Sequence, residues 1–120
     1  ITPDLSSKVS LAVMKQAFSQ STLHGIDQEL SKLQSAEART AQESLRSSSP
    51  RSLQETLLLL RDGRLSTLEA CLKREFKAAQ RAIRHPDLVE GVRAVLVDKD
   101  HEPIWQSEFD SINWALIGIA

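Results

Sequence analysis

Apolar residues recur every three or four positions along most of the chain, the spacing that predicts amphipathic α-helices. No segment alternates apolar and polar residues over the length of a strand, and no Asn-Gly or Asp-Gly pair joins two β-rich runs. The pattern therefore predicts an all-α chain. The expected helices lie at residues 7–18, 23–33, 35–46, 50–63, 67–84 and 87–96.

Several helix boundaries are marked by residues that can satisfy the free backbone groups of a helix end. Ser49 before Pro50 predicts a start, because proline lacks the N–H that would be unsatisfied there and the serine hydroxyl can accept a neighbouring one. The run Ser66-Thr67-Leu68-Glu69 predicts another, with its serine and glutamate as the two partners of a capping box. Gly63 is expected to end the helix at 50–63 in the left-handed conformation.

The apolar faces indicate where these helices should pack. The helix at 50–63 is so rich in leucine that we expect it to be buried on most sides. The next helix carries a stripe spaced by three and four residues, formed by Leu68, Leu72, Phe76, Ala79 and Ile83. In the helix at 87–96 three residues are expected to face inward, namely Leu88, Val92 and Val95. We expect one helical region over residues 1–105 and an apolar tail over 106–120 that a partner or further protein covers.

Composition narrows the class of protein. The chain has 120 residues, a length typical of one domain with a modest core. Only 4% of its residues are aromatic, so the core is expected to be aliphatic. A net charge of -1 argues against duplex DNA or an anionic membrane as the dominant partner, and no stretch is apolar enough to span a bilayer. The single cysteine, Cys71, excludes an internal disulfide framework.

The charge is not evenly spread. Between Arg61 and Arg84 seven basic residues stand against three acidic ones. A solvated helix face with cations suited to the helix dipole explains this run. Contact with a phosphorylated ligand or with RNA remains an alternative, although the few aromatic residues argue against base stacking.

Reactive side chains form no familiar catalytic or metal-binding pattern. His24, His85 and His101 are scattered, and none lies at a ligand spacing from another histidine or from Cys71, so no metal site is expected. The chain has neither a Gly-x-Ser-x-Gly elbow nor a glycine-rich phosphate loop. Acidic residues at positions 98, 100 and 102 suit a polar turn, with cation binding or acid–base chemistry as the alternative.

Four segments carry a resemblance to a known family, one of them the helix segment from Leu68-Glu69 to Glu75-Phe76. The run from Glu90 to Asp100 reads Glu-Gly-Val-Arg-Ala-Val-Leu-Val-Asp-Lys-Asp and is followed by Pro103 and Trp105. The segment 49–53 reads Ser-Pro-Arg-Ser-Leu, and 87–91 reads Asp-Leu-Val-Glu-Gly, with leucine where the family more often has an aromatic residue. In order and spacing these resemble the C-terminal part of the 3-hydroxyisobutyryl-CoA hydrolases, a branch of the crotonase (enoyl-CoA hydratase/isomerase) superfamily.

The resemblance implies a helical C-terminal portion of a crotonase-like α/β fold whose spiral core is absent from this sequence. In that family the core supplies the oxyanion hole and the carboxylates for acyl-CoA thioester hydrolysis in valine catabolism, so no catalytic residue is assigned here. Four residues are the nearest to a functional role by this likeness: Arg93, Asp98, Lys99 and Trp105. The alternative is that Arg93 pairs with Glu90 for structure and Trp105 is an anchor. No cofactor is implied, and acyl-CoA is the family's substrate.

Two interpretations of function follow from the likeness. In the first, the chain supports the CoA pocket and the subunit contacts of a hydrolase, and is not catalytic alone. Its partners are then the missing core, in the same or a separate chain, and further copies of itself, with a location in the mitochondrial matrix, or in the cytoplasm of a bacterium. In the second, it is a non-catalytic structural subunit of an assembly such as a mitochondrial ribosome, with ribosomal RNA or proteins near Arg61–Arg84.

Overall fold

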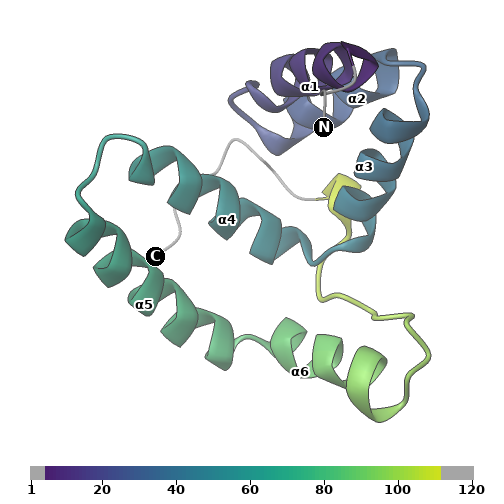
Figure 1. Ribbon diagram of the computed structural model, residues 1–120. Coiled ribbons are helices and arrows are strands. Elements are labelled where there is room, and N and C mark those ends of the chain that lie inside the picture. The colour runs from purple at the N-terminus through teal and green to yellow at the C-terminus, as the bar shows by residue number, and fades with distance from the viewer. Residues whose placement is uncertain (1–4, 112–120) are drawn as a thin grey trace. The chain divides into compact units, whose positions relative to one another are not determined.

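All regular elements between residues 5 and 111, the part that the computed structural model describes, are helices (Figure 1). The α-helices are α1 (Leu5–Phe18), α2 (Leu23–Lys32), α3 (Ala36–Ser47), α4 (Pro50–Gly63), α5 (Leu68–Arg84) and α6 (Pro86–Val92). A π-helical turn, η1 (Arg93–Val97), and a 3-10 turn, η2 (Phe109–Ser111), follow them. The all-α prediction is confirmed for these residues.

The helices form two compact units, which meet in sequence between Ser48 and Ser49. The first unit holds α1, α2 and α3, and the second holds the elements from α4 to η2.

The first unit encloses a small aliphatic core. Helix α2 contacts both α1 and α3, so its apolar side faces two neighbours. The buried apolar side chains are Ala17, Leu23, Ile26, Leu30 and Ala38. A buried carboxylate, Asp27, lies in the same unit and accepts hydrogen bonds from Arg46 on α3 at 2.7 and 3.0 Å. The apolar residues that recur at helical spacing in 23–33 are thus buried in a core, as the sequence predicts.

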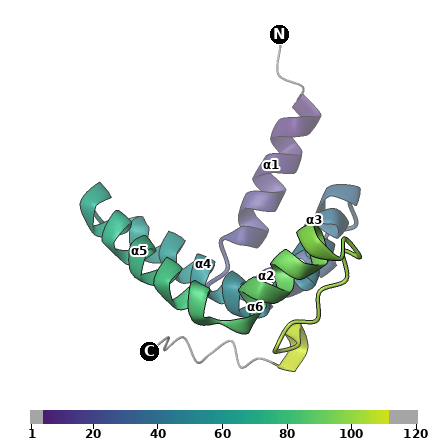
Figure 2. The ribbon, with the colours of Figure 1, turned by 90° about the horizontal axis from the view of Figure 1, so that it is seen from below.

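The second unit is built on an antiparallel pair, α4 and α5, with α6 continuing from the end of α5 (Figures 1 and 2). Their interface buries Ala78 on α5 and the carboxylate of Glu55 on α4. Arg81 on α5 forms an ion pair with Glu55, and Arg51 lies 3.7 Å from the same carboxylate. A small side chain and charged side chains therefore take part in joining these two helices.

The burial expected for the leucine-rich helix at 50–63 and for the helix at 87–96 is wrong. On α4, Leu60 is 66% exposed, and the remaining leucines are only half-buried. Leu88, Val92 and Val95, expected to face inward, are 46%, 43% and 48% exposed. A pair of helices has only one shared interface, and among the described residues of this unit no further layer covers the outward positions.

Two helix ends also differ from the expectation. No glycine in the described residues has a positive φ, so Gly63 does not end α4 in a left-handed conformation. A Cβ on Gly63 would lie 3.4 Å from the sulfur of Cys71, and glycine therefore suits the close approach of α5. The cap of α5 is Thr67, whose hydroxyl accepts the Ala70 amide hydrogen, rather than the expected Ser66.

Ser66 instead donates its hydroxyl to the Asp62 carbonyl at 2.6 Å and accepts from Arg74 at 2.6 Å. The start at Ser49 and Pro50 is as predicted, with the Ser49 hydroxyl accepting from the Ser52 amide. Among the described helices none is long and apolar enough to cross a bilayer. Most of the apolar tail at 106–120, namely residues 112–120, lies outside the described residues, while Phe109 within the tail is buried.

Candidate functional site: the Arg93 cluster

The chain reverses direction directly after η1, which gathers several acidic residues around one arginine. The Asp98 amide donates to the Arg93 carbonyl at 2.8 Å, and the His101 amide donates to the Ala94 carbonyl at 2.9 Å. Lys99 and His101 have φ values of 56° and 55°. These left-handed residues are uncommon outside glycine and make the tight return possible. The reversal brings residues 98–102 back beside α6.

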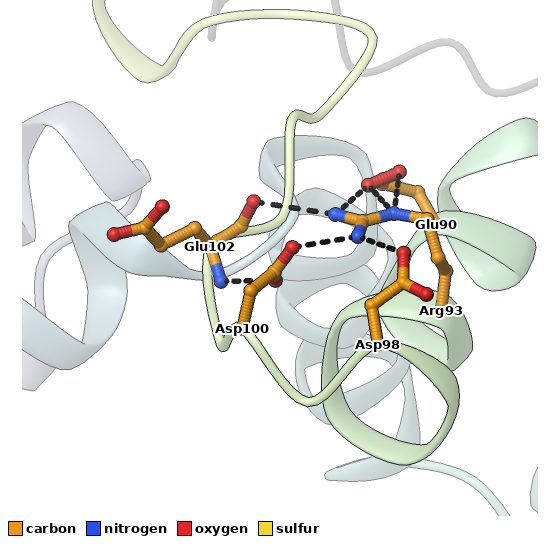
Figure 3. Close-up of polar contacts among 5 residues, drawn as sticks. All are labelled: Glu90, Arg93, Asp98, Asp100 and Glu102. Carbon is orange, nitrogen blue, oxygen red and sulfur yellow. Dashed lines mark hydrogen bonds and ion pairs between the residues drawn. The ribbon is translucent and has the colours of Figure 1, made fainter.

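The Arg93 guanidinium lies at the centre of the cluster (Figure 3). Its Nε donates to the Glu90 carboxylate at 2.6 and 3.1 Å, and Nη2 also pairs with Glu90 at 2.6 Å. Nη1 donates to Asp98 at 2.8 Å and to Asp100 at 2.7 Å. Nη2 reaches the Glu102 carbonyl at 3.4 Å. Because a guanidinium has five N–H donors, these contacts leave none for an anionic ligand.

The cluster shifts the acid–base behaviour of its members. The hydrogen bond from Arg93 lowers the pKa of Glu90 below its ordinary value. The same guanidinium, with the Glu102 amide, lowers the pKa of Asp100. Hydrogen bonds to Glu90 and then to Asp100 and Asp98 raise the pKa of Arg93 further above its already high value. Carboxylates held in the charged form are poor proton donors, so general-acid chemistry is not favoured here.

The next segment, 102–106, is attached to α6 through its backbone amides. The Glu102 amide donates to Asp100 at 2.9 Å, the Ile104 amide to the Glu90 carboxylate, and the Gln106 amide to Asp87 at 2.9 Å. Amides two residues apart point to the same side in extended chain. In a sheet, such amides donate to the carbonyl groups of a neighbouring strand. Here they donate to side-chain carboxylates instead.

Asp87 joins this segment to the start of α4. Its Oδ1 accepts from Gln106, while its Oδ2 accepts the Ser49 hydroxyl at 2.6 Å. Ser49 also caps α4, and Asp87 lies in the first turn of α6. One buried carboxylate therefore connects three segments that are far apart in sequence.

The grouping of Ser49, Asp87 and His85 is not a catalytic triad. The serine hydroxyl donates to the aspartate, and the His85 Nδ1 accepts the Asp87 amide hydrogen at 3.1 Å. A nucleophilic serine needs a histidine nitrogen to take its proton, whereas here that hydrogen bond goes to a carboxylate. The three side chains cap and connect helices.

Trp105 lies with its ring against Gly91 on α6. A Cβ on Gly91 would be 3.4 Å from Cη2 and 3.6 Å from Cζ3 of the indole. Beside this contact is a shallow surface groove of about 710 Å³. It is lined by Pro86, Asp87, Val89, Glu90, Arg93, Ile104, Trp105 and Gln106.

The structure brings together only some of the residues singled out from the sequence. Arg93 and Asp98 share the cluster, and Trp105 lies beside it, whereas Lys99 is exposed and its side chain has no hydrogen-bond or ion-pair partner in the described part of the chain. The pairing of Arg93 with Glu90 is present as expected. The described residues contain no group of three potential metal ligands.

Sequence reasoning missed the role of Asp87 and of Asp100. The spacing of Asp87 after His85-Pro86 indicated only a helix start, and no local pattern links it to Ser49, 38 positions earlier. The acidic positions 98, 100 and 102 were expected to form a turn, and the return of the chain at Lys99 and His101 explains why two of them reach Arg93.

Comparisons with known proteins identify relatives of this chain. The model of the family described as enoyl-CoA hydratase/isomerase matches residues 2–114. The 3-hydroxyisobutyryl-CoA hydrolase, mitochondrial, of Dictyostelium discoideum is 34% identical over 111 residues, which cover 90% of this chain and 29% of the relative. The proteins of the same name from Gallus gallus and Homo sapiens are 38% and 37% identical over 89 and 93 residues, 74% and 78% of this chain.

The matches cover 23% of the Gallus gallus protein and 24% of the Homo sapiens protein. The chain thus spans less than a third of the length of these relatives.

Proposed function

The chain belongs to the enoyl-CoA hydratase/isomerase family, and from this we propose that it is the C-terminal helical portion of a 3-hydroxyisobutyryl-CoA hydrolase-like protein. In this role it supports the acyl-CoA pocket and subunit contacts, and it does not hydrolyse thioesters alone. The relatives named as mitochondrial support a location in the mitochondrial matrix.

The exposed apolar faces of the second unit are the observation that carries this proposal. Leu68, Leu72, Phe76 and Ile83 on α5 are all more than half exposed, although they form a regular helical stripe. A stripe of this kind normally faces a core, and large exposed apolar areas mark contact surfaces. Such a face suits a helical layer that is covered by the rest of a larger fold.

The chemistry of the described residues favours a structural role for this chain over a catalytic one. Arg93 has all its donors engaged, and its hydrogen bonds lower the pKa of Glu90 and of Asp100, which favours their anionic forms. The grouping of Ser49, Asp87 and His85 caps and connects helices. Hydrolysis of a thioester needs donors placed at the developing oxyanion, and these have to come from elsewhere.

A chimera tests the proposal directly. In the Dictyostelium discoideum hydrolase, this chain replaces the matched 111-residue region, and hydrolysis of 3-hydroxyisobutyryl-CoA is measured. We expect the chimera to be active, the same hydrolase with the region deleted to be inactive, and the purified 120-residue chain to show no turnover.

A second chimera with Trp105→Ala separates support from catalysis. It is expected to raise KM more than it lowers kcat, because Trp105 shapes the surface and touches no reacting group. Turnover by the chain alone, or a folded chimera no more active than the deletion, contradicts the proposal. A folded but inactive chimera would instead favour a structural subunit without catalysis.

A further inference from the structure

His85 lies at the junction of two helices, and its backbone is held from both sides. Its amide donates to the Ala82 carbonyl at 3.1 Å at the end of α5, and its carbonyl accepts from the Leu88 amide at 3.2 Å in the first turn of α6. Pro86 directly after it restricts the backbone further. The imidazole, rather than the backbone, is therefore the part of His85 that can respond to a change of conditions.

One nitrogen of this imidazole has two alternative partners, both on Asp87. Nδ1 accepts the Asp87 amide hydrogen at 3.1 Å, and the same nitrogen lies 3.8 Å from the Asp87 Oδ2. A ring nitrogen that accepts a hydrogen bond carries no proton, so uncharged His85 has its proton on Nε2. A charged imidazole has a proton on each nitrogen, so its Nδ1 can donate to the carboxylate but can no longer accept from the amide. The two contacts therefore belong to different charge states of His85.

The carboxylate oxygen that a charged ring would approach is already in use. Asp87 Oδ2 accepts the Ser49 hydroxyl at 2.6 Å, whereas Oδ1 accepts the Gln106 amide hydrogen at 2.9 Å. A charged donor binds a carboxylate more strongly than a neutral one does, so at Oδ2 it competes with the Ser49 hydroxyl. The hydrogen bond from Gln106 lies on the other oxygen and should be affected less.

Other carboxylates do not compete for this histidine. In the described part of the chain Asp87 is the only carboxylate within ion-pair distance of His85, whose side chain is 23% exposed. The remaining charged groups of the adjoining helices pair elsewhere or are exposed, namely Arg51, Glu55, Arg81, Arg84 and Glu90. The charge state of His85 is therefore linked mainly to its two contacts with Asp87.

We propose that His85 is a pH-sensitive switch at the joint formed by Asp87. Uncharged, it caps α6 and leaves Oδ2 to Ser49. Charged, it releases the Asp87 amide, binds the carboxylate and weakens the attachment of the start of α4, while the segment at 102–106 stays attached. Histidine is the side chain that changes charge between about pH 5 and pH 8, so the switch works near neutral pH. This inference does not depend on the hydrolase role proposed above.

Nuclear magnetic resonance of the 120-residue chain tests the switch. The nitrogen shifts of the imidazole report which nitrogen carries the proton, and at about pH 7.5 we expect it on Nε2 alone. Hydrogen exchange is then compared at about pH 7.5 and about pH 5.5, a range in which carboxylates stay charged. After correction for the intrinsic exchange rates, protection of the Asp87 amide is expected to fall about tenfold, because the amide loses its acceptor. Protection of the Gln106 amide is expected to change by less than about twofold.

Two variants separate the charge of His85 from its capping role. In His85→Asn the asparagine still caps a helix but does not titrate, so the Asp87 amide should keep its protection at both pH values. His85→Ser repeats this test with another capping side chain. His101→Asn removes a different histidine of the same unit, at a left-handed position that asparagine tolerates, and is expected to leave the response of the Asp87 amide unchanged.

Urea titrations of Ser49→Ala test the second half of the switch. The variant removes the hydroxyl that donates to Oδ2. Its effect on the unfolding constant is expected to be about threefold smaller at the lower pH, because charged His85 has already weakened that hydrogen bond. When Ser49→Ala is made in the His85→Asn chain, the effect should be the same at both pH values.

Three results would overturn the proposal. At the higher pH the proton of His85 could lie on Nδ1, which could then not accept from the amide. Protection of the Asp87 amide could be the same at both pH values, or could fall as far in His85→Asn as in the unchanged chain. Finally, Ser49→Ala could have the same effect on the unfolding constant at both pH values in the unchanged chain.

Discussion

The two units of this chain place their apolar residues in opposite ways. The first unit buries Leu23, Ile26 and Leu30 between three helices. The second unit buries the polar side chains of Ser49, Glu55 and Asp87, and Phe109 is buried there, but most of its large apolar side chains in the described residues are exposed or half-buried. The comparison shows that the same helical periodicity can end in a core or on a surface, depending on whether a third element covers the stripe.

The two units also differ in the interactions that stabilise them. Apolar burial stabilises the first unit in proportion to the area removed from water. The second unit depends on directed contacts, above all those of Asp87 and Arg93, which hold its segments in place. A unit of this second kind gains stability when a partner covers its exposed apolar face.

The largest expected effect comes from removing a core side chain of the first unit. Leu30 is 1% exposed, so Leu30→Ala is expected to lower the free energy of unfolding by about 2–5 kcal/mol. Phe76→Ala in the second unit removes a larger but exposed side chain and should cost less than about 0.5 kcal/mol. Urea titrations followed by circular dichroism measure both. Equal costs for the two variants would remove the contrast between the units.

A buried polar contact gives the next effect. Asp87→Ala leaves the Ser49 hydroxyl and the Gln106 amide without their acceptor, and is expected to cost about 2–3 kcal/mol in the same titrations. Asp87→Asn keeps one acceptor oxygen and should lose less. If the alanine variant is as stable as the unchanged chain, polar contacts do not hold the second unit together.

The smallest effect is a response to acid. The folded-state pKa values of Glu90 and Asp100 are lowered, so their contribution to stability is complete above the unfolded-state values, near pH 4. It is lost as the pH falls through the lower folded-state values. Arg93→Gln removes the hydrogen bonds that cause the shifts and is expected to flatten the fall of unfolding free energy below about pH 4. The effect is small because the cluster is exposed.

The first unit offers a parallel for the acid response. Burial alone would raise the pKa of Asp27, but hydrogen bonds from Arg46 and Gln42 lower it overall. Arg46→Gln should therefore flatten the acid response as well. Lys99→Gln removes a charge close to the cluster without touching it and serves as the control. An unchanged acid slope in both arginine variants would contradict the assignment.

Local signals predicted the helices well, because they depend on residues close in sequence. The spacing of Leu23, Ile26 and Leu30 is enough to define α2, and Ser49 with Pro50 is enough to start α4. The family likeness rested on the run from Glu90 to Asp100, which the comparisons support over residues 2–114. The sequence is sufficient to predict a structural feature when that feature depends only on residues close to it in the chain.

What the sequence did not predict depends on contacts between distant segments. The stripe on α5 was correct as a pattern, yet periodicity does not say whether a partner layer exists. Ser66, expected as the cap of α5, instead donates to the Asp62 carbonyl and accepts from Arg74, and Thr67 is the cap. The joint at Asp87 depends on Ser49 and Gln106, and neither lies within a turn of it.

The hydrogen bonds that attach segment 102–106 to side-chain carboxylates affect whether other chains can add to it as β-strands. An extended edge with free amides is a template on which other chains add as strands, and can lead to aggregates. Here the amides at 102, 104 and 106 are occupied by carboxylates, and Pro103 between them has no N–H to offer. A helical protein thereby carries an irregular segment on its surface without presenting a β-edge to its neighbours.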